Sequence, residues 1–174
     1  MKTNDTKMAV QKKLMIMRHA KSSWDDTSLK DFDRPLNDRG NRDAPRMGRY
    51  LKELDLIPDF VVSSPALRAH QTITHVAKVT GLDQRSIQWN ADLYFQGADA
   101  YITSVKSAPD DASIVLIAGH NPTVEQVVSV LSTGSSVRSM TTANIVCFDV
   151  SSGSWSDLAT DNCKFKWHVG PKDL

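Results

Sequence analysis

The chain has 174 residues, of which 40% are hydrophobic and 24% are charged; these values are close to the averages for soluble globular proteins and favour one domain with a buried core. The 21 Lys and Arg residues nearly balance the 20 Asp and Glu residues, and the formal net charge of +1 excludes a whole-molecule field that would attract nucleic acid or an anionic membrane. The apolar runs are far shorter than the roughly 20 residues of a membrane span, and the polar N-terminus lacks the apolar stretch of a secretory signal, so we expect a cytoplasmic protein.

The first predicted elements are a strand and a helix joined by a long loop. Residues 1–12 form a polar extension, and the apolar run 14–17 predicts a short buried strand, so we expect a single domain over residues 13–170. The polar stretch 24–37 has no sustained period and predicts an exposed loop. Apolar side chains then recur every three or four residues, which predicts an amphipathic helix ending near Asp55. This stripe consists of Met47, Tyr50, Leu51 and Leu54.

A second strand is expected to lead directly into a second helix. The compact apolar run 59–63 predicts the strand. Ser64 followed by Pro65 predicts a helix N-cap with proline at the first helical position. Gly81 is expected to end this helix in a left-handed conformation. Residues 100–106 predict a further short helix.

The same order of strand and helix returns later in the chain. Residues 114–118 predict a buried strand, and Asn121 followed by Pro122 predicts the cap of a helix with its apolar stripe over 124–131. Residues 145–150 and 164–168 predict two late strands. Because apolar strands alternate with helices, we expect a three-layer αβα sandwich with a mainly parallel sheet. No repeat or linker indicates a second domain.

Three fragments place unusual polar residues at the carboxyl ends of predicted strands: MRHAKSSW at 17–24, SSPALRAHQT at 63–72 and GHNP at 119–122. Ligand sites of open α/β sheets form at that edge, so side chains distant in sequence can converge there. Arg18 and His19 follow the first strand, Arg68 lies at the start of the next helix, and His120 follows a later strand.

Two arginines and two histidines suit the transfer of a phosphoryl group. Guanidinium groups bind phosphate oxygens through paired, charge-assisted hydrogen bonds, and a neutral imidazole can attack phosphorus. Such a set stabilises the transition state without a metal or another cofactor. A cation near a helix N-terminus opposes the helix dipole, so Arg68 favours either a bound anion or an ion pair with a nearby carboxylate.

At these residues the sequence resembles the histidine phosphatase superfamily, which includes the cofactor-dependent phosphoglycerate mutases. The three fragments, with DRPLNDRG at 33–40, extend the resemblance from about residue 14 to residue 131. The RHAKSSW form and the short chain are most similar to the SixA-type phosphohistidine phosphatases. The resemblance implies that His19 becomes phosphorylated, while Arg18, Arg68 and His120 bind the phosphoryl group and stabilise its transfer.

Many members of this superfamily use a carboxylic acid to protonate the leaving group. The matching stretch here is ADLYFQGAD, in which Asp92 is the nearest carboxylate and therefore the candidate acid. Ser22 is better explained as a loop or capping residue, and Asn121 as a helix cap. No spacing typical of metal ligands joins the other histidines or the two cysteines to an acidic residue, so we expect no metal site and two reduced thiols.

Three functions remain open at this stage. The first is a phosphatase that hydrolyses a phosphomonoester or a phosphohistidine, with a phosphorylated protein as a candidate partner because the chain is short for one that carries a long lid over small metabolites. The second is a mutase, which needs a closed pocket that excludes water. The third is a phosphate-dependent binding module, which would not need the two histidines. The oligomeric state is not indicated by the sequence.

Overall fold

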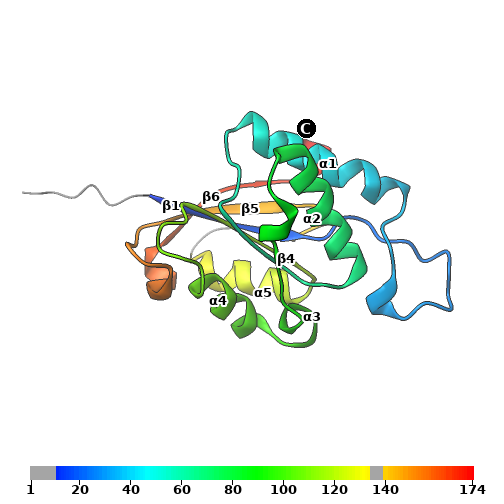
Figure 1. Cartoon of the computed structure of the whole chain (residues 1–174). Coiled ribbons are helices and arrows are strands. Elements are labelled where there is room, and N and C mark those ends of the chain that lie inside the picture. The colour runs from blue at the N-terminus through cyan, green and yellow to red at the C-terminus, as the bar shows by residue number, and fades with distance from the viewer. Residues whose placement is uncertain (1–10, 134–138) are drawn as a thin grey trace, which may run out of the picture.

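A six-stranded sheet forms the middle layer of the computed structural model, which describes residues 11–133 and 139–174 (Figure 1). The strand order is β3-β2-β4-β1-β5-β6. The first four of these pair in parallel, whereas β5 and β6 are antiparallel. The strands are β1 (Lys12–Arg18), β2 (Phe60–Ser63), β3 (Gln88–Trp89), β4 (Ile114–Gly119), β5 (Ile145–Val150) and β6 (Cys163–Val169).

Helices cover both faces of this sheet (Figure 1). One face carries α1 (Asp38–Glu53) and α2 (Leu67–Thr80), and the other carries α3 (Asp92–Phe95), α4 (Ala98–Lys106) and α5 (Thr123–Leu131). The predicted αβα sandwich with a mainly parallel sheet is therefore confirmed. Within the described part of the chain, no helix has both the length and the apolar character needed to cross a membrane.

The side chains of β1 explain why its sequence is a continuous apolar run. Leu14 and Ile16 pack into the core under α4 and α5, while Met15 and Met17 pack into the core under α1 and α2. All four side chains are fully buried. A strand covered on both faces cannot alternate between apolar and polar residues. The polar residues that follow β1 therefore stand out as a departure from the core pattern.

The helix ends agree only in part with the local sequence signals. Gly81 ends α2 with φ of +81°, as predicted. The predicted Ser64 cap is wrong, since α2 begins at Leu67 with Ala66 as its N-cap. The predicted Asn121 cap is also wrong, because α5 begins at Thr123 with Pro122 at the N-cap. Leu54 is 45% exposed because α1 ends one residue before it.

The N-terminal extension expected over residues 1–12 lies largely outside the described residues. The prediction is wrong for Lys12, because this residue begins β1 and is buried. Its ammonium group donates hydrogen bonds to the backbone carbonyls of Asp110 and Ala112. The sheet therefore starts two residues before the apolar run 14–17 and one residue before the predicted domain.

Candidate active site

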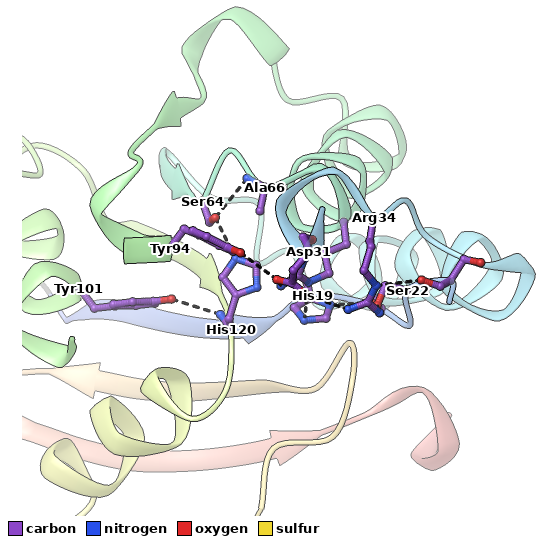
Figure 2. Close-up of polar contacts among 12 residues, drawn as sticks. His19, Ser22, Asp31, Arg34, Ser64, Ala66, Tyr94, Tyr101 and His120 are labelled. Atoms are coloured by element: carbon purple, nitrogen blue, oxygen red, sulfur yellow. Dashed lines mark hydrogen bonds and ion pairs between the residues drawn. The ribbon is translucent and has the colours of Figure 1, made fainter. Parts of the chain in front are cut away.

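The four residues singled out in the strand-end fragments meet in one cavity. Arg18 ends β1 and His19 follows it, His120 follows β4, and Arg68 lies in the first turn of α2. Because β2, β4 and β1 are adjacent and parallel, their carboxyl ends bring these side chains to the same edge of the sheet. Figure 2 shows His19 and His120 at this edge. The cavity has a volume of about 220 Å³. Its other lining residues are Lys21, Ser22, Trp24, Arg34, Asn121 and Thr142.

The imidazole of His19 is oriented with one nitrogen available for attack. Its Nδ1 lies 2.7 Å from the carbonyl oxygen of Ala20, which requires the proton on Nδ1 and leaves a lone pair on Nε2. The Nε of Arg68 donates to this Nε2 at 3.3 Å. Burial, followed by the nearby His120, Arg68 and Arg18, lowers the pKa of His19 to about 3. The ring is therefore neutral at pH 7, as a nucleophile must be.

His120 is held next to His19, with 5.0 Å between the ring centroids. Its Nε2 forms a 2.8 Å hydrogen bond with the hydroxyl of Ser64, and its backbone N–H donates to the hydroxyl of Tyr101. Burial and the charge of Arg68 lower the pKa of His120 to about 3. A side chain at Gly119 would overlap the Tyr101 hydroxyl, so glycine is required there for this contact.

Arg18 is fixed by the segment that follows α5. Its Nη1 donates to the carbonyl oxygen of Met140 at 2.8 Å. The backbone N–H of Met140 donates to the carboxylate of Glu125, and the side-chain amide of Asn121 donates both to that carboxylate and to the Met140 carbonyl. This arrangement explains why Asn121 does not cap α5. Through one carboxylate it also joins the segment after β4 to the segment before β5, on which Arg18 rests.

Several buried polar atoms at the cavity have no hydrogen-bond partner among the described residues. They are Arg18 Nε, His120 Nδ1 and Asn121 Oδ1, which account for three of the five such atoms in the described part of the chain. Buried polar groups are satisfied in most native proteins, and exceptions concentrate at sites that bind a ligand. Asn121 Oδ1 can only accept a hydrogen bond, but Arg18 Nε and a protonated His120 Nδ1 can donate to an anion. Together with the positive charges of the lining arginines and Lys21, these two donors favour a small oxoanion.

Three residues of the site were missed by the sequence reasoning: Asp31, Arg34 and Tyr94. Asp31 accepts hydrogen bonds from Arg34, Arg68 and the Tyr94 hydroxyl (Figure 2). Burial would raise the pKa of Asp31, but these hydrogen bonds and the Arg68 charge outweigh it and lower the pKa to about 2. The ion pair foreseen as an alternative for Arg68 is thus present. Of the three, only Arg34 lies in a fragment of the resemblance, DRPLNDRG at 33–40, to which no residue role was attached.

The loop predicted to be exposed over residues 24–37 contains a buried arginine. Arg34 is 6% exposed and donates hydrogen bonds to the Ser22 hydroxyl and to the Ser23 carbonyl. Its guanidinium also lies 3.2 Å from the centroid of the Trp24 ring. The loop is therefore folded against the cavity through Arg34. Ser22, expected to have only a loop role, lines the cavity and binds Arg34.

Asp92 is not brought to the cavity. It begins α3, is exposed, and accepts a hydrogen bond from the Gln96 amide at 2.8 Å. Together with Asn90, Gln96 and Asp99 it lines a separate hollow. The structure thus separates this carboxylate from the two histidines with which a leaving-group acid would have to act.

We therefore expect Asp92→Asn to change kcat/KM by less than about 3-fold, whereas loss of a true general acid costs about 10²- to 10⁴-fold on a poor leaving group. The measurement compares an alkyl phosphate, which needs a proton donor, with an activated aryl phosphate, which does not. A large loss confined to the alkyl phosphate would restore Asp92 as the acid.

No group of three or more His, Cys, Asp or Glu side chains in residues 11–133 and 139–174 is arranged to hold a metal ion. His70 stacks on Trp89 with 4.2 Å between centroids, and His75 contacts the side chain of Asn41. The two cysteines are unpaired and buried. None of these residues lines the cavity.

The two buried neutral histidines should make the fold sensitive to acid. Both pKa values are lowered from 6.5 to about 3, so the unfolded chain binds more protons than the folded protein below pH 6.5. Stability is therefore complete above about pH 6.5 and is lost as the pH falls toward 3, by about 2 kcal/mol per histidine at pH 5. Urea unfolding between pH 4 and 7.5 measures this slope. His120→Gln should make it shallower; equal slopes would contradict the assignment.

The chain is similar to known proteins in both sequence and structure. Residues 14–93 match the family model described as the histidine phosphatase superfamily (branch 1). An uncharacterized chloroplastic protein of Arabidopsis thaliana is 33% identical over 86% of this chain and 71% of its own length. A putative phosphohistidine phosphatase SixA from Nakamurella multipartitia is 27% identical with a TM-score of 0.79, covering 92% of this chain and 96% of that one. The protein histidine phosphatase SixA complexed with tungstate is 26% identical with a TM-score of 0.72, covering 92% and 98%.

Proposed function

The chain belongs to the histidine phosphatase superfamily, and we propose that this phosphatase removes phosphoryl groups through a phosphorylated His19. The observation that carries the proposal is the neutral His19 ring, whose Nε2 lone pair faces a cavity lined by arginines. Tungstate, with which one SixA relative is complexed, is a tetrahedral oxoanion with the shape and charge of phosphate. A relative that binds such an anion supports the proposal that this chain also binds a phosphoryl group.

In the proposed mechanism, His19 Nε2 forms a bond to phosphorus while the bond from phosphorus to the leaving group breaks. Arg18 and Arg68 donate hydrogen bonds to the phosphoryl oxygens, where the negative charge of the transition state is spread. His120 adds a further contact through its unpartnered Nδ1. A water molecule then attacks the phosphorylated His19, and inorganic phosphate leaves with the histidine neutral again.

The substrate that best suits this site is a phosphohistidine on another protein. Among the described residues around the cavity, both histidines are neutral at pH 7, and the Asp31 carboxyl, with a pKa of about 2, is ionised. None of these three groups is therefore a protonated acid that could donate to a leaving group. An alkoxide leaving group would need such a proton. The imidazole of a phosphohistidine can be protonated by solvent before it leaves. A SixA relative is described as a protein histidine phosphatase, which supports the same class.

The two alternative functions fit the site less well. A mutase must retain the phosphorylated histidine away from water, yet Trp24 at the cavity is 67% exposed. A binding module would need the arginines but not a histidine tautomer fixed with Nε2 free of a proton. Hydrolysis is therefore the function that needs both the fixed His19 tautomer and a site open to water.

A substrate panel tests this function. It contains a phosphohistidine peptide, a phosphoserine peptide, a sugar phosphate, a nucleotide and an aryl phosphate, all assayed for phosphate release at pH 7. We expect kcat/KM to be highest for the phosphohistidine peptide, with the aryl phosphate second. A sugar phosphate or nucleotide at the head of the order would overturn the proposed substrate class.

We also propose that turnover needs neither a metal nor another cofactor, because Arg18, Arg68 and Lys21 supply positive charge at the phosphoryl group. Treatment with a chelator, followed by gel filtration into metal-free buffer, should leave kcat/KM within about 2-fold of its starting value, whereas loss of a catalytic metal would remove several kcal/mol of stabilisation. Restoration of a lost rate by added magnesium or zinc would place the enzyme in a different mechanistic class.

A further inference from the structure

Apolar rings flank both ends of the phosphate cavity and are exposed to solvent. Among the large hydrophobic side chains of the described residues, Phe95 at 72% and Trp24 at 67% have the highest exposure. Trp24 lines the cavity itself. Phe95 lies next to Tyr94, and Tyr94 lies next to His120 of the cavity. The ring centroids are 4.8 Å apart in the first pair and 5.4 Å apart in the second. Large exposed apolar side chains beside a polar site mark a surface that another molecule covers.

These rings are held in place before any partner arrives. Phe32, Tyr94 and Phe95 pack against one another, with centroid distances of 4.9 Å between Phe32 and Tyr94 and 6.2 Å between Phe32 and Phe95. The Tyr94 hydroxyl is anchored on Asp31. Rigid side chains lose little conformational entropy on binding, so their exposed faces are well suited to recognition.

The Trp24 ring is fixed at the other end by Arg34. The guanidinium lies 3.2 Å from the ring centroid and is itself held by Asp31, Ser22 and the Ser23 carbonyl. Figure 2 shows Tyr94 beside His120 at one end of the group of polar side chains and Arg34 with Ser22 at the other. The anion-binding groups thus lie between two apolar surfaces: Trp24 on one side and, on the other, Phe32 of the same loop together with Tyr94 and Phe95 of α3.

We propose that these two surfaces form a docking site for the polypeptide on either side of a phosphorylated residue, with apolar side chains of that polypeptide covering Trp24 and the Phe32, Tyr94 and Phe95 group. This inference rests on the proposed function and adds to it the sequence preference of the substrate. The cavity, with a volume of about 220 Å³, takes the phosphoryl group, and the polypeptide on either side of the phosphorylated residue lies outside it. Because an extended polypeptide advances about 3.3 Å per residue, the residues before and after the phosphorylated position run away from the cavity toward the two surfaces.

Charge at the mouth sets a second condition on this partner. Lys21, Arg18, Arg34 and Arg68 line the cavity, and two carboxylates lie near them: Asp31, which pairs with Arg34 and Arg68, and Glu125, whose charge acts on Arg18. Basic residues beside the phosphorylated position would be repelled by this group of cations. The docking site therefore favours apolar flanks over Lys and Arg.

The test compares three N-phosphoryl substrates: phosphoimidazole, a phosphohistidine peptide with leucine on both sides, and the same peptide with serine on both sides. We expect the wild-type protein to hydrolyse all three and to prefer the leucine peptide. Phe95→Ser and Trp24→Ser should each lower the kcat/KM ratio of the leucine peptide to phosphoimidazole by at least about 5-fold, the size expected when one contributing side chain is removed from an interface. Leu54→Ser is the matched control, because Leu54 is also exposed but lies before the amino end of β2, at the opposite edge of the sheet.

The outcomes separate the docking site from the catalytic proposal. Hydrolysis of phosphoimidazole with equal kcat/KM for the two peptides would overturn the docking site and leave the proposed function standing. Equal losses on phosphoimidazole and on the leucine peptide would show that the rings bind a small leaving group, which also contradicts docking of flanking residues. Hydrolysis of none of the three by the wild-type protein would overturn both. Thermal melts of each variant verify that the fold is intact.

Discussion

Replacement of His19 by alanine is expected to lower kcat/KM by at least about 10⁴-fold, because no second group in the cavity can form the covalent intermediate in its place. His120 is the nearest imidazole, but in the proposed mechanism its unpartnered Nδ1 carries the proton and contacts the phosphoryl oxygens, while its Nε2 is engaged by the Ser64 hydroxyl. His19→Gln keeps most of the side-chain volume at this buried position, and it should lose the same activity if the fold is preserved.

The covalent intermediate gives a readout that a structural role for His19 cannot produce. A labelled substrate quenched during turnover should leave acid-labile phosphate on a peptide that contains His19. His70→Ala is the control, since His70 is exposed on α2 and stacks on Trp89 outside the cavity. It should retain both the label and the rate. Label on a serine, or a variant without His19 that turns over normally, would disprove the proposed nucleophile.

The architecture of this site was predictable because its first four residues interrupt an otherwise apolar pattern. Arg18 and His19 directly follow the fully buried run 14–17 of β1, and His120 follows β4. Parallel pairing then requires the carboxyl ends of β1 and β4 to lie side by side. A local pattern and a general rule of topology were sufficient, and no knowledge of side-chain contacts was needed.

Asp31, Arg34 and Tyr94 could not be found in the same way. Asp31 and Tyr94 are 63 positions apart in sequence, and each lies in an element too short to produce a periodic pattern: Asp31 begins a three-residue turn of 3₁₀ helix, and Tyr94 belongs to the four-residue α3. Their contact exists only because the loop over 24–37 folds back across the cavity. Arg34 resembles any charged loop residue until its burial is known.

The two incorrect helix caps share one physical cause. Ser64 and Asn121 both have the side chains and the neighbours typical of N-caps. In the structure the Ser64 hydroxyl contacts His120, and the Asn121 amide contacts Glu125 and Met140. The Asn121 amide positions the site instead of the helix end, and the Ser64 hydroxyl contacts His120 while also accepting from the Ala66 N–H just before α2. Local rules are expected to fail where function competes for the same atoms.

Loss of Arg68 is expected to weaken both catalysis and anion binding. Its Nε contacts the attacking nitrogen of His19, and its Nη groups can pass from Asp31 to the phosphoryl oxygens. Removal of one such donor from a transition state costs about 10²- to 10³-fold in rate, so Arg68→Ala should lose about that factor in kcat/KM. Arg68→Lys retains the charge but not the paired hydrogen bonds, and it should recover only part of the loss.

Anion binding by Arg68 can be measured without turnover, through the melting temperature in phosphate and vanadate. A ligand at a hundred times its Kd adds about 2.7 kcal/mol of stability, which for a domain of this size raises Tm by roughly 5 to 10 °C. Vanadate should have the larger effect because it adopts the five-coordinate geometry of the transferring group. The predicted shift is therefore large enough to resolve, and greater than the general stabilisation by excluded phosphate.

Arg85→Ala is the matched control for this measurement, because Arg85 has a 91% exposed side chain paired with Asp83 away from the cavity. Excluded phosphate should stabilise the wild-type protein, Arg68→Ala and Arg85→Ala alike, since these substitutions hardly change the exposed surface. Only specific binding distinguishes them. Wild type and Arg85→Ala should therefore gain the full vanadate shift, while Arg68→Ala should gain less than about half of it, as expected when a charge-assisted contact is lost. If all three proteins gain equally across the titration, Arg68 does not bind the anion, and the proposed arrangement of the phosphoryl group is wrong.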